Sequence, residues 1–188
     1  MTALFDADCA NAAEFEQPHW KIIARGLKTE EWFNDGQGVG TGGIVTPQPT
    51  RMPAGQYYYR FASSTSPRSA QLGGGWWIDF EAFHTIETFA RANAYRVRDA
   101  ARLMLALPYS WTKVDRLFHA LLQSPMRAYT GFGKPAQGGD AADKGTKWIP
   151  TQHIKVRQLY VPGLYVQGRA KQLYETVFLQ PVKDIPLQ

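Results

Sequence analysis

Short aromatic or apolar segments lie on both sides of a helical middle, and this order constrains the fold more than any other feature. Residues 57–61 are aromatic and precede a serine-rich turn, and residues 76–78 follow three glycines. Aromatic residues favour extended backbone and glycine and serine favour turns, so both segments are predicted strands. Three late segments are also predicted strands: residues 153–161, 164–167 and 172–180. Strands that gather at both ends, without alternating with helices, predict an α+β fold.

The middle of the chain carries apolar residues at helical spacing. The residues that share one helical face are Phe83, Ile86, Ala90, Ala94, Val97, Ala101 and Met104. Pro108 ends this predicted helix. A second helix is predicted between a cap at Ser110 or Thr112 and its end at Pro125, and Thr112 and Asp115 have the spacing of a capping box.

The first part of the chain differs in composition from the rest. Residues 15–33 have helical character, whereas residues 34–55 are dominated by glycine and proline and predict a long loop. A second polar loop is predicted over residues 131–147. We therefore divide the chain into a lead-in, residues 1–55, and a main domain, residues 56–188.

Composition excludes several classes of protein. No apolar run approaches the ~20 residues of a membrane span, and the first residues carry Asp6 and Asp8 without the basic residues of a secretory signal. A single cysteine, Cys9, excludes an intrachain disulfide and a cysteine-rich zinc site. The four histidines show no metal-binding spacing. A cytoplasmic protein without a metal centre or membrane contact is the expectation.

The net charge is +5 and unevenly distributed, with −3 over residues 1–55 and +8 over residues 56–188. Such a basic body indicates an anionic ligand, for example a dinucleotide or RNA, although scattered lysines on a solvated surface give the same count. Gly38, Gly40 and Gly43 form a G-x-G-x-x-G pattern, but no strand precedes it and no apolar-periodic helix follows. A Rossmann interpretation therefore lacks its structural context.

Three features occur in a recognisable order. Arg60 lies on the aromatic strand and is followed by serines, Gly75-Trp76-Trp77 begins a glycine-led aromatic strand, and Glu175 lies in a late apolar segment. Over roughly residues 55–180 this order resembles the catalytic core of the ADP-ribosyltransferase superfamily, which includes bacterial toxins and the poly(ADP-ribose) polymerases. The resemblance implies mixed, mainly antiparallel sheets around an NAD cleft, with flanking helices.

The resemblance also implies roles for single residues. Arg60 and Glu175 would be the catalytic residues, with the glutamate stabilising the ribosyl cation and the arginine holding NAD. NAD, consumed as a substrate, would further contact Ser63, Ser64, Gly75, Trp76 and Trp77. These roles suit the chemistry. A carboxylate stabilises an oxocarbenium-like transition state, an arginine fork binds a diphosphate, and an aromatic shelf suits a flat ring.

Two departures from the family pattern concern the acceptor. Ser64-Thr65-Ser66 follows the first strand directly and is not on the second, and Leu173 stands where arginine-modifying relatives have the first glutamate of an E-x-E pair. With the basic body, this favours RNA over an arginine side chain as the acceptor of ADP-ribose, and other protein acceptors remain open. The resemblance further implies a bacterial toxin or effector, and thus an antitoxin or immunity protein as partner.

Each candidate residue also has a structural interpretation. Arg60 could cover neighbouring tyrosines, Glu175 could pair with Lys171 or Arg169, and the two tryptophans could belong to the core. The stripe Arg91, Arg98 and Arg102 could be a solvated helix face or contact nucleic acid. The alternative function is a non-catalytic module that binds RNA or a protein partner through basic and aromatic residues.

Overall fold

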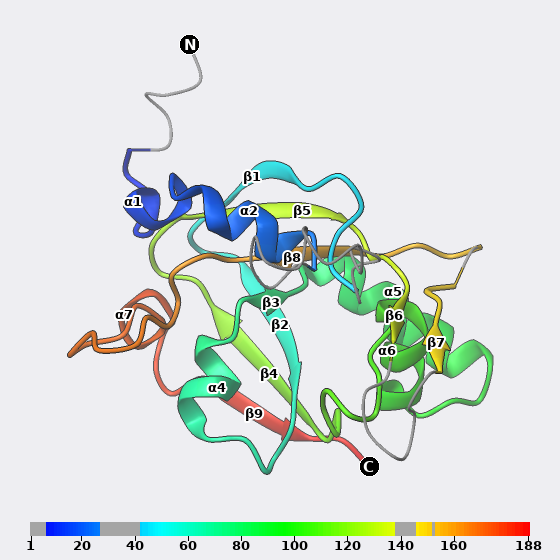
Figure 1. The fold of residues 1–188 in the computed structure, drawn as a ribbon. Coiled ribbons are helices and arrows are strands. Elements are labelled where there is room, and N and C mark those ends of the chain that lie inside the picture. Colours follow the sequence, from blue (N-terminus) through cyan, green and yellow to red (C-terminus); the bar gives the residue numbers. More distant parts are fainter. Residues whose placement is uncertain (1–6, 27–41, 138–145, 152) are drawn as a thin grey trace.

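Two antiparallel sheets and a short hairpin form the frame of the molecule (Figure 1). The structure is a computed structural model that describes residues 7–26, 42–137, 146–151 and 153–188. The four-stranded sheet has the order β1 (Gln48–Met52), β5 (Met126–Phe132), β8 (Arg157–Tyr160) and β3 (Trp76–Trp77). The three-stranded sheet has the order β2 (Tyr57–Ala62), β4 (Arg116–Leu121) and β9 (Lys183–Pro186). The hairpin consists of β6 (Ala136–Gln137) and β7 (Lys147–Trp148). The predicted α+β class is confirmed.

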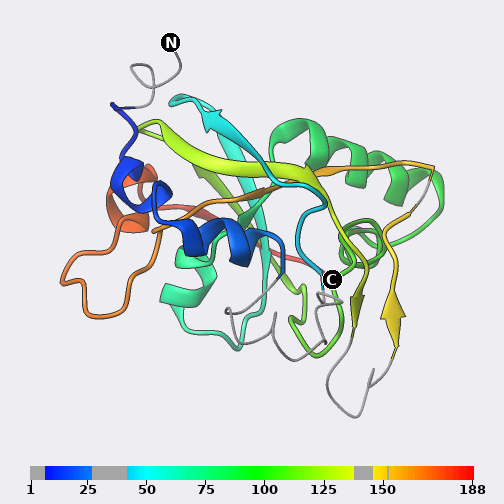
Figure 2. The same ribbon diagram turned by 45° about the horizontal axis from the view of Figure 1, so that its top comes forward.

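Helices cover the outer faces of both sheets. The helices are α1 (Ala12–Phe15), α2 (Pro18–Ala24), α4 (Arg68–Gly73), α5 (Phe80–Ala92), α6 (Val97–Leu105) and α7 (Tyr174–Val177). Helices α1 and α2 lie on the four-stranded sheet (Figure 2). Phe15 of α1 stacks there on Tyr129 of β5, with ring centroids 4.5 Å apart. Helices α5 and α6 pack on the three-stranded sheet through a cluster that includes Tyr59 and Ile86.

The main core lies between the two sheets. Tyr58 and Ala62 of β2 face it with Phe118 of β4, and Trp77 and Leu159 face it from the other sheet. Their alternation with outward residues such as Tyr59 follows from the two-residue period of a strand. Trp77 and Phe118 are fully buried. Burial of each such side chain contributes roughly 2–3 kcal/mol, so the inter-sheet layer is the main source of stability.

Several predicted elements are wrong. Residues 116–121 form strand β4, not a helix, because β2 and β9 pair with this segment on both sides. Residues 174–177 form helix α7 inside the predicted strand 172–180. The predicted helix over 83–104 is two helices, separated where Ala94 has a φ of 55°. The predicted loop over residues 34–55 contains strand β1. The predicted loop over residues 131–147 contains the end of β5, all of β6 and the first residue of β7.

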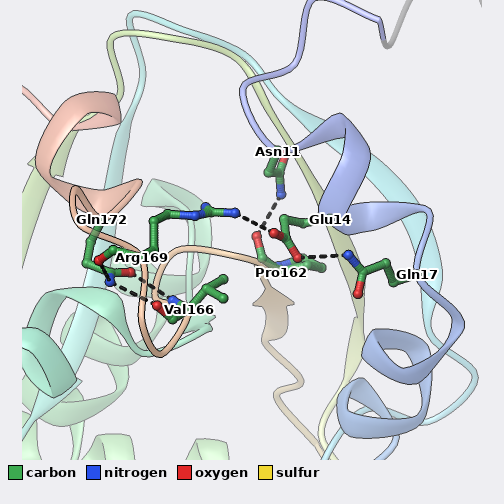
Figure 3. A network of polar contacts seen from close by, with 7 residues as sticks. All are labelled: Asn11, Glu14, Gln17, Pro162, Val166, Arg169 and Gln172. Carbon is green, nitrogen blue, oxygen red and sulfur yellow. Dashed lines mark hydrogen bonds and ion pairs between the residues drawn. The ribbon is translucent and has the colours of Figure 1, made fainter.

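A set of polar contacts, which we call the N-terminal clasp, fastens α1 to the body of the molecule (Figure 3). Asn11 is 1% exposed; its Nδ2 donates to the carbonyl oxygens of Arg127 and Pro162, both at 2.9 Å, and its Oδ1 accepts from the Arg127 backbone N–H at 2.8 Å. Glu14 pairs with Arg169 at 2.5 Å. The described part of the lead-in thus packs against the main domain, and the division at residue 55 stays a prediction.

Replacing Asn11 with alanine is expected to lower the free energy of unfolding by about 2–3 kcal/mol, because buried backbone groups lose their partners. Urea denaturation would measure the change. Gln17→Ala is the control, since Gln17 makes only an exposed hydrogen bond to Glu14, and its effect should stay within ~0.5 kcal/mol. An Asn11→Ala protein as stable as this control would remove Asn11 from the clasp.

Candidate functional site

A cavity of about 860 Å³ opens beside the edge of the four-stranded sheet. It is lined from several sides by the end of α2, strands β2 and β3, the connection between α6 and β4, and strand β8. Its aromatic lining residues are Tyr59, Phe61, Trp76, Trp77 and Trp111, and its polar ones include Arg60, Ser63, Gln71, Thr112, Gln137 and Gln158. A concave, mainly apolar site of this size with a few polar groups is typical of small-molecule and cofactor sites.

Arg60 of β2 lines the cavity, and its side chain also bonds backbone carbonyls of α4 and β3. Its Nε donates to the Gln71 carbonyl oxygen at 2.7 Å, Nη1 to that of Trp76 at 2.6 Å, and Nη2 to that of Ala70 at 3.2 Å. Ala70 and Gln71 lie in α4, whose last carbonyls have no partner within the helix and favour a cation. Burial lowers the pKa of Arg60 to about 10, so the side chain remains charged at neutral pH. Three of its five N–H groups are used here, which leaves two for a ligand.

Gly74 makes room for this guanidinium. A Cβ at Gly74 would lie 1.9 Å from Nη2 of Arg60. Any side chain at this position would displace Arg60. The absence of a side chain at Gly74, in the glycine-rich turn before β3, therefore leaves the space that the Arg60 guanidinium occupies.

The two tryptophans of β3 face opposite sides of the sheet. Trp77 is 2% exposed, its Nε1 donates to the Gly74 carbonyl oxygen at 2.8 Å, and its ring packs on Phe178. Trp76 is partly exposed and meets Tyr160 edge-on, with ring centroids 4.9 Å apart. The Trp77 ring thus packs in the core, and of these two tryptophans Trp76 is the one available to a ligand.

The remaining predicted binding residues divide into two groups. Ser63 lines the cavity and shares a 2.8 Å hydrogen bond with Thr65. Ser64 and Gly75 are not lining residues. Ser64 donates from its backbone N–H and its hydroxyl to Asp115, both at 2.6 Å. Gly75 packs on Tyr160, whose Cε2 would lie 2.7 Å from an added Cβ.

Glu175 does not lie in the predicted strand, nor does it line the cavity. It is an exposed residue of α7, and its Oε2 accepts a hydrogen bond from the backbone N–H of Gln172 at 3.1 Å. The proposed pairing with Arg169 is also not seen, because Arg169 pairs with Glu14. The described residues that line the cavity include no carboxylate. A catalytic role for Glu175 stays a prediction.

Gln158 is the lining residue that the sequence did not reveal. It lies on β8, is 9% exposed, and its Nε2 donates to the Leu105 carbonyl oxygen at 3.3 Å. Gly133 packs against the same nitrogen, since a Cβ there would lie 2.5 Å from it. This contact orients the amide and leaves its Oε1 as an acceptor for a ligand. No motif surrounds Gln158, so only the three-dimensional structure identifies it.

Arg102 shapes the connection between α6 and β4. It is 4% exposed, donates to the carbonyl oxygens of Leu107, Thr112 and Lys113 at 2.7–3.0 Å, and lies 4.0 Å over the Tyr109 ring. The predicted solvated stripe with Arg91 and Arg98 is therefore wrong at Arg102. This arginine holds the turn that carries Trp111 to the cavity.

An aromatic stack behind the cavity contains a histidine. His119 of β4 lies against Tyr57 and Tyr59, with ring centroids 4.2 and 4.7 Å apart, and Tyr59 stacks in turn on Phe83. The His119 Nε2 is buried, and no described residue gives it a hydrogen-bond partner. Burial, and then the charge of Lys183, lower the pKa of His119 below 6.5.

The fold is expected to lose stability in mild acid because of this histidine. The folded state disfavours protonation, so the full stability is present above pH 6.5 and is lost as the pH falls through the lower folded pKa. Thermal unfolding between pH 7.5 and 5 would show a falling midpoint. His119→Phe keeps the ring stack and should flatten this part of the curve; an unchanged pH dependence would contradict the assignment.

Among the described residues, no group of three or more His, Cys, Asp or Glu side chains is placed to hold a metal ion. None of the described helices has the length and hydropathy that crossing a membrane requires.

Comparison with known proteins identifies no family for this chain. No model of a protein family matches the sequence, and no curated protein matches it either. Among solved structures, the chain is similar to Rhs1-CT in complex with its cognate immunity protein RhsI1. The two share 15% sequence identity with a TM-score of 0.43, over 81% of this chain and 89% of that chain.

Proposed function

We propose that the protein is a mono-ADP-ribosyltransferase that binds NAD in this cavity and breaks its nicotinamide–ribose bond. One observation carries the proposal. Arg60, Ser63, Trp76 and Trp77, which were assigned to NAD from the sequence resemblance, come from two strands and a turn and line the same cavity. The size and the aromatic lining of the cavity suit a dinucleotide with two flat rings.

The lining residues support distinct roles. Trp76 offers its partly exposed ring to the nicotinamide, and the free N–H groups of Arg60 donate to the ligand. The reaction separates a neutral nicotinamide from a ribosyl group that becomes positively charged, so no strong general acid is needed. The negative end of the Gln158 amide dipole would stabilise this charge from a fixed position in the cavity wall.

We propose RNA as the preferred acceptor of ADP-ribose, with protein as the other candidate. The net charge of +8 over residues 56–188 would attract phosphates, and Leu173 leaves no E-x-E pair for an arginine side chain. The toxin role, and with it an antitoxin or immunity protein as partner, belongs to the same proposal. Such an inhibitor would be acidic if it meets the basic body.

The decisive experiment is incubation of the purified protein with NAD while released nicotinamide is measured by chromatography. Labelled NAD would then be offered separately to cellular RNA and to cellular protein, at low and at raised salt. Label in RNA that declines with salt supports the RNA acceptor, and label only in protein rejects it. RNA retention without nicotinamide release would instead identify the non-catalytic module.

A further inference from the structure

Trp111 is an aromatic residue of the cavity wall to which the roles assigned above give no ligand. It lies in the connection between α6 and β4 and lines the cavity. Its side chain is 47% exposed, whereas Tyr59 and Trp77 are buried and Phe61 and Trp76 are half-buried. Trp111 is therefore the most accessible aromatic side chain of the cavity wall.

The position of Trp111 is set by contacts of both its ring and its backbone. A Cβ at Gly42 would lie 2.6 Å from Cη2 of the Trp111 ring, so the edge of the ring fits against this glycine, which also lines the cavity. The Trp111 backbone N–H donates to the Pro108 carbonyl oxygen at 3.1 Å. Arg102 binds the carbonyl of the next residue, Thr112, at 2.7 Å. A ring that is held in place before the ligand arrives loses little entropy when a ligand stacks on it.

The partly exposed ring of Trp76 belongs to a different wall, the one that carries Gln158. Trp76 lies directly opposite Tyr160 in the β3–β8 pairing. Gln158 precedes Tyr160 by two positions, so Trp76, Tyr160 and Gln158 share one face of the four-stranded sheet. The nicotinamide end of NAD belongs at this face, beside the amide that we assign to the reaction. The ring at the other end of NAD is adenine, and Trp111 is open to it.

We propose that Trp111 is the stacking surface for the adenine ring of NAD and makes the cavity selective for purine nucleotides. The inference rests on the proposed function for the identity of the ligand. A base that stacks on an aromatic side chain gains roughly tenfold or more in affinity. A purine covers more of an indole ring than a pyrimidine does, so we expect AMP to bind more tightly than UMP.

The test uses the two halves of NAD, AMP and nicotinamide mononucleotide, which bind whether or not NAD is turned over. We expect calorimetry to show that Trp111→Ala binds AMP about tenfold more weakly, with unchanged binding of nicotinamide mononucleotide, and that Trp76→Ala gives the reverse pattern. Trp111→Phe keeps an aromatic face and should retain most of the AMP affinity. Tyr95→Ala is the control, because Tyr95 is 49% exposed but is not a lining residue. In the turnover assay, Trp111→Ala should raise KM for NAD about tenfold with little change in kcat.

The outcomes separate this inference from the proposed function. AMP that binds Trp111→Ala as tightly as Tyr95→Ala, or that does not bind the wild type, would overturn the stacking surface. Equal loss of both mononucleotides in Trp111→Ala would overturn the assignment of the two rings to separate walls. Selective loss of AMP binding in a protein that never releases nicotinamide would support an adenine nucleotide site at Trp111 and reject NAD consumption.

Discussion

Alanine in place of Gln158 is expected to slow nicotinamide release by at least ~100-fold, which is the scale observed when one preorganised dipole is removed from a transition state. The amide is held by Leu105 and packed by Gly133, so its Oε1 would not have to reorganise as the ribosyl charge develops. Nicotinamide release at saturating NAD, measured with a folded protein, checks the result.

Two further variants make this experiment selective. Gln137→Ala removes another lining amide, one that is exposed, and should retain activity within a few-fold. Glu175→Gln tests the residue that the family resemblance assigns to catalysis. Near-normal release by Gln158→Ala, together with inactive Glu175→Gln, would return the catalytic role to the glutamate and reject our assignment of Gln158.

Methionine in place of Arg60 is expected to lower the free energy of unfolding by roughly 2–4 kcal/mol, because three carbonyl oxygens lose a charged donor. Methionine keeps most of the length and apolar area of the side chain, so the loss reports on the guanidinium. Urea denaturation is the measurement. Arg68→Met serves as control, since Arg68 is exposed and its contacts are a 3.7 Å ion pair with Asp184 and a cation–π contact with the Phe118 ring at 4.9 Å, neither of which engages a backbone carbonyl.

Arg60→Lys then separates stability from binding. Lysine can serve fewer of the three carbonyls and cannot reproduce a planar fork, so we expect partial stability and weaker binding of NAD by calorimetry. Full stability of Arg60→Met would show that the carbonyl contacts do not hold α4 and β3 together. Unchanged NAD affinity of Arg60→Lys would leave Arg60 with a structural role alone.

The local sequence pattern predicted the secondary structure correctly where its preference agreed with tertiary packing. Residues 57–62 are aromatic and bounded by turns, and they form β2; the glycine-led tryptophans form β3. The prediction of a helix for residues 116–121 was wrong because Leu117, Phe118 and Ala120 are compatible with either a helix or a strand. Pairing with β2 and β9, which are distant in sequence, decides between the two.

The site was predictable only in part for the same reason. Arg60 and Trp76 lie within motifs that resemble a known family, so their positions could be assigned in advance. Gln158 reaches the cavity because β8 pairs with β5 and β3, which are distant in sequence, and no local pattern encodes that pairing. Glu175 was assigned from the family resemblance, which expects it in a strand, whereas the chain forms helix α7 there.

The N-terminal clasp also imposes an order on the synthesis of the protein. Its contacts join residues separated by 116, 151 and 155 positions, so α1 cannot complete them until Arg169 has been translated. At ~5–20 residues per second, the ribosome takes roughly 10–30 s to reach Arg169 after Glu14. Because α2 follows α1 and contributes Ile23 to the cavity wall, the nascent chain lacks a complete binding site throughout that interval. The complete cavity wall therefore forms only after Arg169 has been translated.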